Sequence, residues 1–222
     1  MKHLFADRVQ AGRALAREIA KLGLPAPIVL ALPRGGVPVA AEIARELGAP
    51  LDLLLVRKIG VPWQPELAVA AVVDGPDQEL VIDEDTRAAT GVGRGYIEAK
   101  AKEQIQEIER RRHLYLGDRL PLPVDNCTAI VVDDGIATGT SMRAALKALR
   151  RRKPAALVMA VPVAPPDTIE ALRREVDRVV CLAQPEPFYA VGSHYDDFHQ
   201  VEDDEVMATL AEFITPPQPK SE

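Results

Sequence analysis

Apolar residues occur along this chain in short runs that alternate with segments of helical spacing. The runs predict buried strands over residues 28–32, 51–56, 67–73, 80–82, 129–132, 156–161 and 179–182. Between several of them, apolar positions recur every three or four residues, which predicts helices over 37–47, 141–152 and 166–175. Strands that alternate with helices predict an α/β fold, with a mainly parallel, Rossmann-like sheet covered by helices on both faces.

Three further helices are predicted outside this alternation. The first lies within residues 1–24, with Asp7 as its cap and Gly23 beyond its end. The second is a long helix whose apolar stripe runs from Tyr96 to Tyr115, and the third spans 203–214. The first two ranges contain no proline, as a long helix requires.

Composition supports one domain. The chain has 222 residues, of which 47% are hydrophobic, enough for one substantial core. We expect a single domain over 1–222, with a core over about 1–184, a small C-terminal hood over 185–215 and a frayed tail over 216–222. The 19 prolines are concentrated near turns, and several of them flank the segments that carry the candidate chemistry.

Charge and segment length exclude several classes of protein. The net charge of −6 argues against a nucleic-acid binder that works through a broad basic surface, so no DNA partner is expected. No apolar run is long enough to cross a bilayer, and the first residues do not resemble a signal peptide, so we expect a cytoplasmic protein without membrane contact. Cys127 and Cys181 lack the spacing of a disulfide scaffold or zinc site.

The most informative segment follows the strand at 129–132. It reads Ala-Ile-Val-Val-Asp-Asp-Gly-Ile-Ala-Thr-Gly-Thr-Ser over residues 129–141. Two carboxylates at a strand end can accept hydrogen bonds from sugar hydroxyls, and a small-residue loop before a helix can hold a phosphate. The arrangement suggests a ribose 5-phosphate site, and the alternative is an ordinary strand-to-helix turn with capping side chains.

This segment resembles the signature of the type I phosphoribosyltransferases, which bind phosphoribosyl pyrophosphate. The resemblance implies that Asp133 and Asp134 contact the ribose hydroxyls. It also implies that the 5′-phosphate is held by the residues of the following loop: Gly135, Ile136, Ala137, Thr138, Gly139 and Thr140.

A second turn resembles the pyrophosphate loop of the purine-type members. Pro33-Arg34-Gly35-Gly36 follows the strand at 28–32 and precedes a helix. The resemblance implies that Gly35 and Gly36 expose backbone amides to the leaving pyrophosphate, while Arg34 supplies a forked positive charge. Arg57 and Lys58, at another predicted strand end, are further candidates for phosphate contact, and the Pro/Trp segment 61–66 for a mobile loop.

A third segment, residues 189–196, is similar to the hood of the hypoxanthine-guanine members. By that spacing Tyr189, with Phe188, would stack on the base, and Asp196 would help to hold Mg²⁺ through water. The loop departs from those members, because Ala137 occupies the position of the aspartate that handles the purine proton, and alanine cannot move a proton. The acceptor base is therefore left open, and Glu66 is a candidate replacement only if its loop folds over the site.

The resemblance as a whole implies a Mg²⁺-dependent transferase of nucleotide metabolism. It would move the 5-phosphoribosyl group from phosphoribosyl pyrophosphate to a nitrogenous base and release pyrophosphate, with Asp133, Asp134 and Arg34 central to catalysis. Related enzymes are usually homodimers, so a homodimer is expected. The alternative is a non-catalytic regulator that senses phosphoribosyl pyrophosphate or a nucleotide. A hydrolase that acts at this turn is disfavoured because Asp133-Asp134-Gly135 lacks the Asp-x-Asp pattern.

Overall fold

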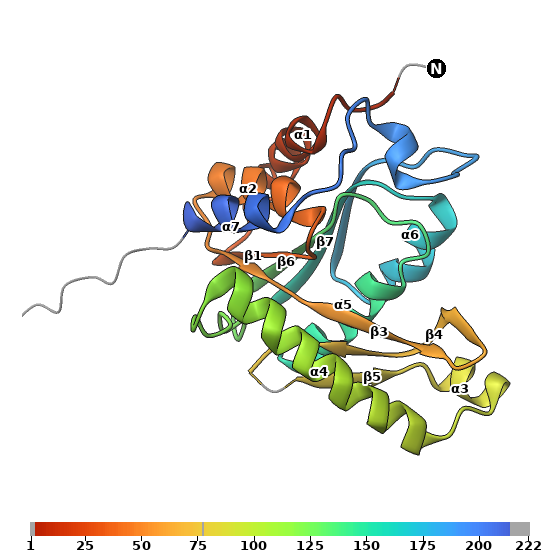
Figure 1. The fold of residues 1–222 in the computed structure, drawn as a ribbon. Coiled ribbons are helices and arrows are strands. Elements are labelled where there is room, and N and C mark those ends of the chain that lie inside the picture. Colours follow the sequence, from red (N-terminus) through yellow and green to blue (C-terminus); the bar gives the residue numbers. More distant parts are fainter. Residues whose placement is uncertain (1–2, 77, 214–222) are drawn as a thin grey trace, which may run out of the picture.

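The computed structural model describes residues 3–76 and 78–213, which form two sheets covered by helices (Figure 1). The larger sheet is parallel, in the order β2-β1-β6-β7-β8. Its strands are β1 (Pro27–Ala31), β2 (Leu51–Leu53), β6 (Thr128–Val132), β7 (Ala156–Val163) and β8 (Arg178–Ala183). The smaller sheet is antiparallel and consists of β3 (Val56–Val61), β4 (Gln64–Val73) and β5 (Glu79–Ile82). The prediction of a mainly parallel α/β fold is confirmed, and the expected tail at 216–222 lies outside the described residues.

Helices cover both sheets. They are α1 (Arg8–Ala20), α2 (Gly36–Leu47), α3 (Glu84–Thr90), α4 (Arg94–Leu116), α5 (Thr140–Arg151), α6 (Pro166–Arg173) and α7 (Asp203–Ala211), with a 3-10 turn η1 (Val191–His194). The pair α1 and α2 packs on one face of the parallel sheet, and α5 and α6 pack on the other. Helix α5 also contacts the antiparallel sheet, so it lies between the two sheets, while α4 packs on β3 and β4 (Figure 1).

The central strand β6 is the most deeply buried element of the site. Its residues are completely inaccessible to solvent, and they pair with β1 on one side and β7 on the other. Ile130 and Val132 belong to the core under α1 and α2, whereas Ala129 and Val131 belong to the core under α5. Each fully buried branched side chain stabilises the fold by about 1.5–3 kcal/mol. The residues that follow β6 therefore start from a rigid position.

The first helix begins as the sequence predicts. The Asp7 carboxylate accepts a hydrogen bond from the Gln10 backbone N–H at 2.7 Å, as an N-cap does. This cap places Arg8 in the first turn of α1, with its side chain directed inward, 8% exposed. Arg8 becomes important at the site.

The predicted strand over 51–56 is wrong in one respect, because it consists of two elements. Leu51–Leu53 joins the parallel sheet, and the chain then leaves that sheet to begin β3 at Val56. Leu54 and Leu55 at the junction are buried, and the Leu54 N–H still donates to the Ala31 carbonyl at 2.9 Å. The unbroken apolar stretch 53–56 therefore conceals the change of sheet, because its junction is also buried.

A buried ion-pair network joins α4 to both sheets. Arg112 of α4 donates to Asp52 of β2 at 3.2 Å and to Asp74, which follows β4. The Asp52 and Asp74 side chains are 2% and 4% exposed. Burial raises the pKa of Asp74, and the Arg112 guanidinium opposes that rise. The network ties the antiparallel sheet to the edge of the parallel one.

The turn η1 and the helix α7, which both follow β8, pack against different elements. The turn η1 lies against the loop after β6, because Val191 leaves no room for a Cβ atom at Gly135. Helix α7, by contrast, packs against α2 and α4 on the other side (Figure 1). The segment before α1 lies beside the residues that follow η1, because Phe5 forms a parallel bridge with Tyr195.

Candidate functional site

Two adjacent carboxylates emerge from the end of β6. Asp133 and Asp134 are mostly buried, and the Asp134 N–H donates to Asp133 Oδ1 at 2.9 Å. Burial and the adjacent Asp134 charge raise the pKa of Asp133 well above its usual range. Burial also raises the pKa of Asp134. Two such groups hold a double negative charge poorly unless hydroxyl donors or positive charge face them, and a ligand can supply both.

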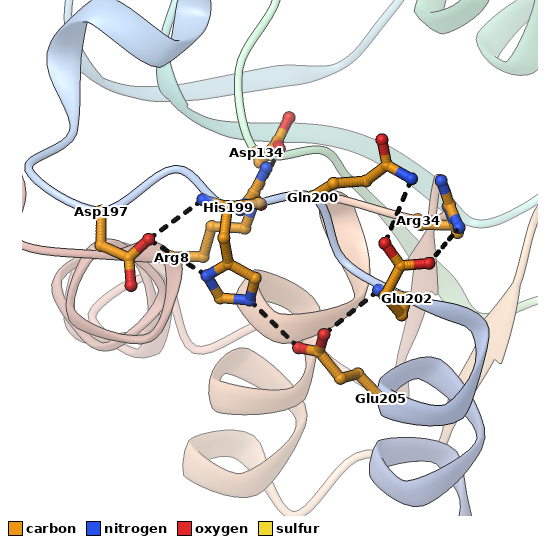
Figure 2. A network of polar contacts seen from close by, with 8 residues as sticks. All are labelled: Arg8, Arg34, Asp134, Asp197, His199, Gln200, Glu202 and Glu205. Carbon is orange, nitrogen blue, oxygen red and sulfur yellow. Dashed lines mark hydrogen bonds and ion pairs between the residues drawn. The ribbon is translucent and has the colours of Figure 1, made fainter.

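Arg8 is the protein's own counter-charge for this pair. Its Nε donates to Asp134 Oδ2 at 2.7 Å, and its Nη1 donates to the His199 carbonyl at 2.8 Å (Figure 2). The guanidinium also lies over the Phe198 ring, 3.8 Å from its centroid. Arg8 lowers the pKa of Asp134 against the larger effect of burial. Arg8 thus fixes the position of Asp134, a role that the sequence did not reveal.

The turn after β1 packs directly against the carboxylates. A Cβ atom at Gly35 would overlap with Asp134 Oδ2, and one at Gly36 would lie 2.7 Å from the Val132 carbonyl oxygen. The peptide bond between Pro33 and Arg34 is cis. The two turns that the sequence singled out are therefore in direct contact. Only glycine fits at both positions, because a side chain would fill the space that the other turn occupies.

Acids of α7 and its cap flank the Arg34 side chain. Its Nη1 lies 3.4 Å from Glu202 Oε2 (Figure 2). The same atom lies 3.5 Å from Asp203 Oδ1. These contacts are long, and the Arg34 side chain is 28% exposed. Asp203 has a closer partner in the Tyr115 hydroxyl, which donates to it at 2.6 Å, and burial raises the pKa of Tyr115 to about 12. An anion that approached Arg34 would therefore compete, among the described residues, only with its two long contacts to Glu202 and Asp203.

The loop between β6 and α5 is anchored by hydrogen bonds to β7 and α6, and part of it is exposed to solvent. The Ile136 N–H donates to the Val163 carbonyl at 3.0 Å, and Thr168 Oγ1 donates to the Ala137 carbonyl at 2.7 Å. Ala137 and Thr138 are exposed, and Thr138 Oγ1 lies 3.3 Å from Thr140 Oγ1 at the start of α5. Two threonine hydroxyls and the N-terminus of α5 thus converge at the surface, as an anion site requires.

The hood residues are only partly gathered around the site. Tyr189 is 82% exposed, and the Phe188 ring lies 5.0 Å from the His194 ring. Asp196 faces outward, where its Oδ1 lies 2.8 Å from His3 Nδ1. Tyr195, which the sequence did not single out, is a hood residue that contacts the turn after β6, because its hydroxyl donates to the Asp134 backbone carbonyl.

Two histidines lie near the hood in different surroundings. His199 Nδ1 lies 3.1 Å from Asp197, and its Nε2 lies 3.2 Å from Glu205 (Figure 2). Hydrogen bonds to these two acids raise the pKa of His199. Burial lowers the pKa of His194. His199 therefore belongs to a surface network, and its backbone carbonyl links it to the site by accepting a hydrogen bond from Arg8.

The two basic residues of β3 point in opposite directions. Arg57 Nε donates to Gln104 Oε1 of α4 at 3.0 Å. Lys58 instead lines a cavity of about 480 Å³ together with Thr138, Thr140 and Glu66. The predicted mobile segment is the turn of the β3–β4 hairpin, and Trp63 at this turn is 67% exposed. The structure thus brings Lys58, but not Arg57, next to the loop after β6.

The site offers oxygen ligands but no ready-made metal cage. Within residues 3–76 and 78–213, no three His, Cys, Asp or Glu side chains are grouped to hold a metal ion. Mg²⁺ that enters on a phosphate needs only one or two carboxylates, which Asp133 and Asp134 could provide. Over the same ranges, every helix is too short or too polar to cross a membrane.

The chain is similar to known proteins over most of its length. A family model described as "Phosphoribosyl transferase domain" matches residues 4–197. A Mycobacterium tuberculosis H37Rv protein named "Putative phosphoribosyl transferase Rv0571c" is 45% identical over 207 residues, which are 93% of this chain and 46% of that protein. This chain thus spans about half the length of the curated relatives it matches. The crystal structure of TT1426 from Thermus thermophilus is 44% identical, covers 94% of this chain and 98% of that chain, and superposes with a TM-score of 0.84.

Proposed function

The chain belongs to the phosphoribosyl transferase family, and from that premise we propose that it transfers a 5-phosphoribosyl group from phosphoribosyl pyrophosphate to a nitrogenous base. The observation that carries the proposal is the contact between two turns. The carboxylate pair after β6 lies against the Arg34-Gly35-Gly36 turn after β1. A ribose ring on the carboxylates would therefore have its pyrophosphate directed towards Arg34.

Each turn has a defined task in this proposal. Asp133 and Asp134 accept hydrogen bonds from the ribose hydroxyls, which orients the sugar. Thr138, Thr140 and the backbone amides before α5 hold the 5′-phosphate. Arg34 and the amides of Gly35 and Gly36 stabilise the negative charge that leaves with pyrophosphate.

The proposed reaction breaks the bond between the anomeric carbon and pyrophosphate as the base nitrogen forms a new bond to that carbon. The protein mainly holds the two reactants in line and stabilises the charge that departs. Mg²⁺ bound to the pyrophosphate oxygens would offset part of that charge. The proton that the base loses needs an acceptor other than Ala137, because its methyl side chain has no proton-transfer group.

Binding of the donor is the first test. Calorimetry with phosphoribosyl pyrophosphate and Mg²⁺ should detect binding to the native chain, and Asp134→Asn should weaken it at least fivefold. Asp125→Asn is the matched control, because Asp125 is exposed and lies outside both turns. The assignment would be refuted by unchanged affinity in folded Asp134→Asn, or by absence of binding to the native chain at millimolar donor.

Turnover is the second test. A screen for pyrophosphate release should include purines, pyrimidines and their precursors as acceptors. Release with one of these bases would support the transferase. Donor binding without release across the whole panel would instead favour a non-catalytic regulator that senses phosphoribosyl pyrophosphate or a nucleotide.

A further inference from the structure

The cavity of about 480 Å³ between α5 and the antiparallel sheet lies beside the site described above. One wall is a single face of α5, formed by Thr140, Arg143, Ala144 and Lys147, whose spacing of three and four residues aligns them. The opposite wall is the sheet face that faces α5. The volume lies within the range of small-molecule sites, about 300–1,000 Å³.

Small side chains make this space hollow. Ala71 of β4 pairs with Lys58 of β3 on one side and with Val81 of β5 on the other, so the three side chains lie in a row on one face. Ala71, Val81 and Ala144 are also part of one buried apolar cluster. Because the alanine side chains of α5 and β4 are short, they leave a gap between the helix and the sheet, and they form its apolar floor.

The rim of the cavity carries cations without acidic partners. Lys58, Arg143 and Lys147 line it, and none forms an ion pair within the part of the chain that the structure describes. The last turn of the same helix differs, because Arg150 pairs with Asp177 and Arg151 pairs with Glu79.

A buried arginine nitrogen and the state of the two acids in the lining also favour an anion in the cavity. The Nε atom of Arg143 is buried and has no hydrogen-bond partner among the described residues. Of the two acids that line the cavity, Asp83 is engaged in capping α3 through the Thr86 N–H at 2.9 Å. The other, Glu66, is exposed. An anion that entered the cavity would therefore meet cations whose charge is not already neutralised.

We propose that this cavity binds an organic anion, with an acidic head group, phosphate or carboxylate, and an apolar body of aromatic size. The head group would contact Arg143, Lys147 and Lys58, and the body would rest on the alanine floor. The cavity is lined by Thr138 and Thr140 but not by the carboxylate pair or Arg34. It therefore adjoins the proposed 5′-phosphate loop and shares these two threonines with it, while an anion held by Arg143 and Lys147 goes beyond the proposed transfer reaction.

A pair of fluorescent probes tests the proposal. 1-Anilinonaphthalene-8-sulfonate has an anionic head and an aromatic body, and N-phenyl-1-naphthylamine has the same body without the charge. We expect the anionic probe to bind the native chain and Lys147→Met to weaken that binding about tenfold. The neutral probe should bind more weakly and should not respond to the substitution.

Lys102→Met is the matched control. Lys102 is an exposed lysine of α4 without an ion-pair partner among the described residues, so its substitution changes the net charge equally at a distant place. It should leave binding of the anionic probe unchanged. Arg143→Met is a second variant of the rim, and it should weaken this binding as Lys147→Met does.

Donor binding separates the cavity from the ribose site. Lys147→Met should bind phosphoribosyl pyrophosphate within about twofold of the native affinity. The proposal is overturned if Lys147→Met binds the anionic probe as the native chain does, if Lys102→Met weakens it equally, or if Lys147→Met loses both ligands together. If the native chain bound no phosphoribosyl pyrophosphate, the proposed function would fail while the probe experiments still tested the cavity.

Discussion

Replacement of Arg8 by methionine should separate the charge of this side chain from its bulk. Methionine keeps most of the apolar stem, but it removes the donors to Asp134 and to the His199 carbonyl and the cation over the Phe198 ring. The Arg8 and Asp134 side chains are 8% and 13% exposed, so the lost pair is a buried one. Removal of one partner from a buried pair costs about 3–5 kcal/mol. Because Asp134 can be protonated, we expect a loss of about 3 kcal/mol at pH 7.

The loss should depend on pH in a defined direction. Arg8 favours the charged form of Asp134, so without it the already raised pKa of this carboxyl rises further. A carboxyl whose pKa is raised by folding adds stability below its unfolded pKa, and that stability is lost as pH rises through the folded pKa. The difference between native protein and Arg8→Met should therefore be smaller at pH 5 than at pH 7.

Urea unfolding followed by circular dichroism measures both quantities. Arg13→Met is the matched control, because Arg13 of the same helix pairs with Glu42 at 2.8 Å but is 64% exposed. It should cost less than about 1 kcal/mol. In the double variant Arg8→Met/Asp134→Asn, the loss should fall at least about 1 kcal/mol below the sum of the single losses. Equal losses for Arg8→Met and Arg13→Met, or full additivity, would refute the assignment of Arg8 as the counter-charge.

Three other substitutions test the site and its support. Gly35→Ala should weaken phosphoribosyl pyrophosphate binding at least tenfold by calorimetry, because its Cβ would collide with Asp134, whereas Gly93→Ala, with open space around it, should not. Asp133→Asn should raise the thermal midpoint of the free protein at pH 7, because burial and a like charge disfavour its ionised form, and should also weaken donor binding. Arg112→Met should lower the unfolding free energy in urea by about 3 kcal/mol or more, because two buried carboxylates lose their partner.

The parts of the site that the sequence made predictable are those where neighbours in the chain are neighbours in space. Asp133 and Asp134 follow a run of buried residues, so their place at a strand end could be predicted from the run alone. The Arg34 turn could be brought beside them because the ends of adjacent parallel strands share an edge. The contact of Arg8 with Asp134 could not be predicted, since 126 residues separate the two and nothing in the sequence couples them.

Other differences arose where a local pattern had more than one structural solution. Arg57 and Lys58 were grouped as one basic pair, but successive residues of a strand face opposite sides, so they serve α4 and the cavity separately. The unbroken apolar stretch 53–56 crosses from one sheet to the other without a polar residue to mark the change. The antiparallel sheet itself depends on the buried Arg112 network, whose members lie 38 and 60 residues apart.

The bridge between Phe5 and Tyr195 also bears on the order in which this protein is made. The N–H groups of Leu4 and Phe5 donate to the His194 carbonyl at 3.0 and 3.1 Å, and the Asp196 N–H donates to the Phe5 carbonyl at 2.9 Å. These contacts cannot form until residues 194–196 have been synthesised, although the core strands that precede them can pair earlier. The segment before α1 therefore stays unpaired until the hood that follows β8 has been made.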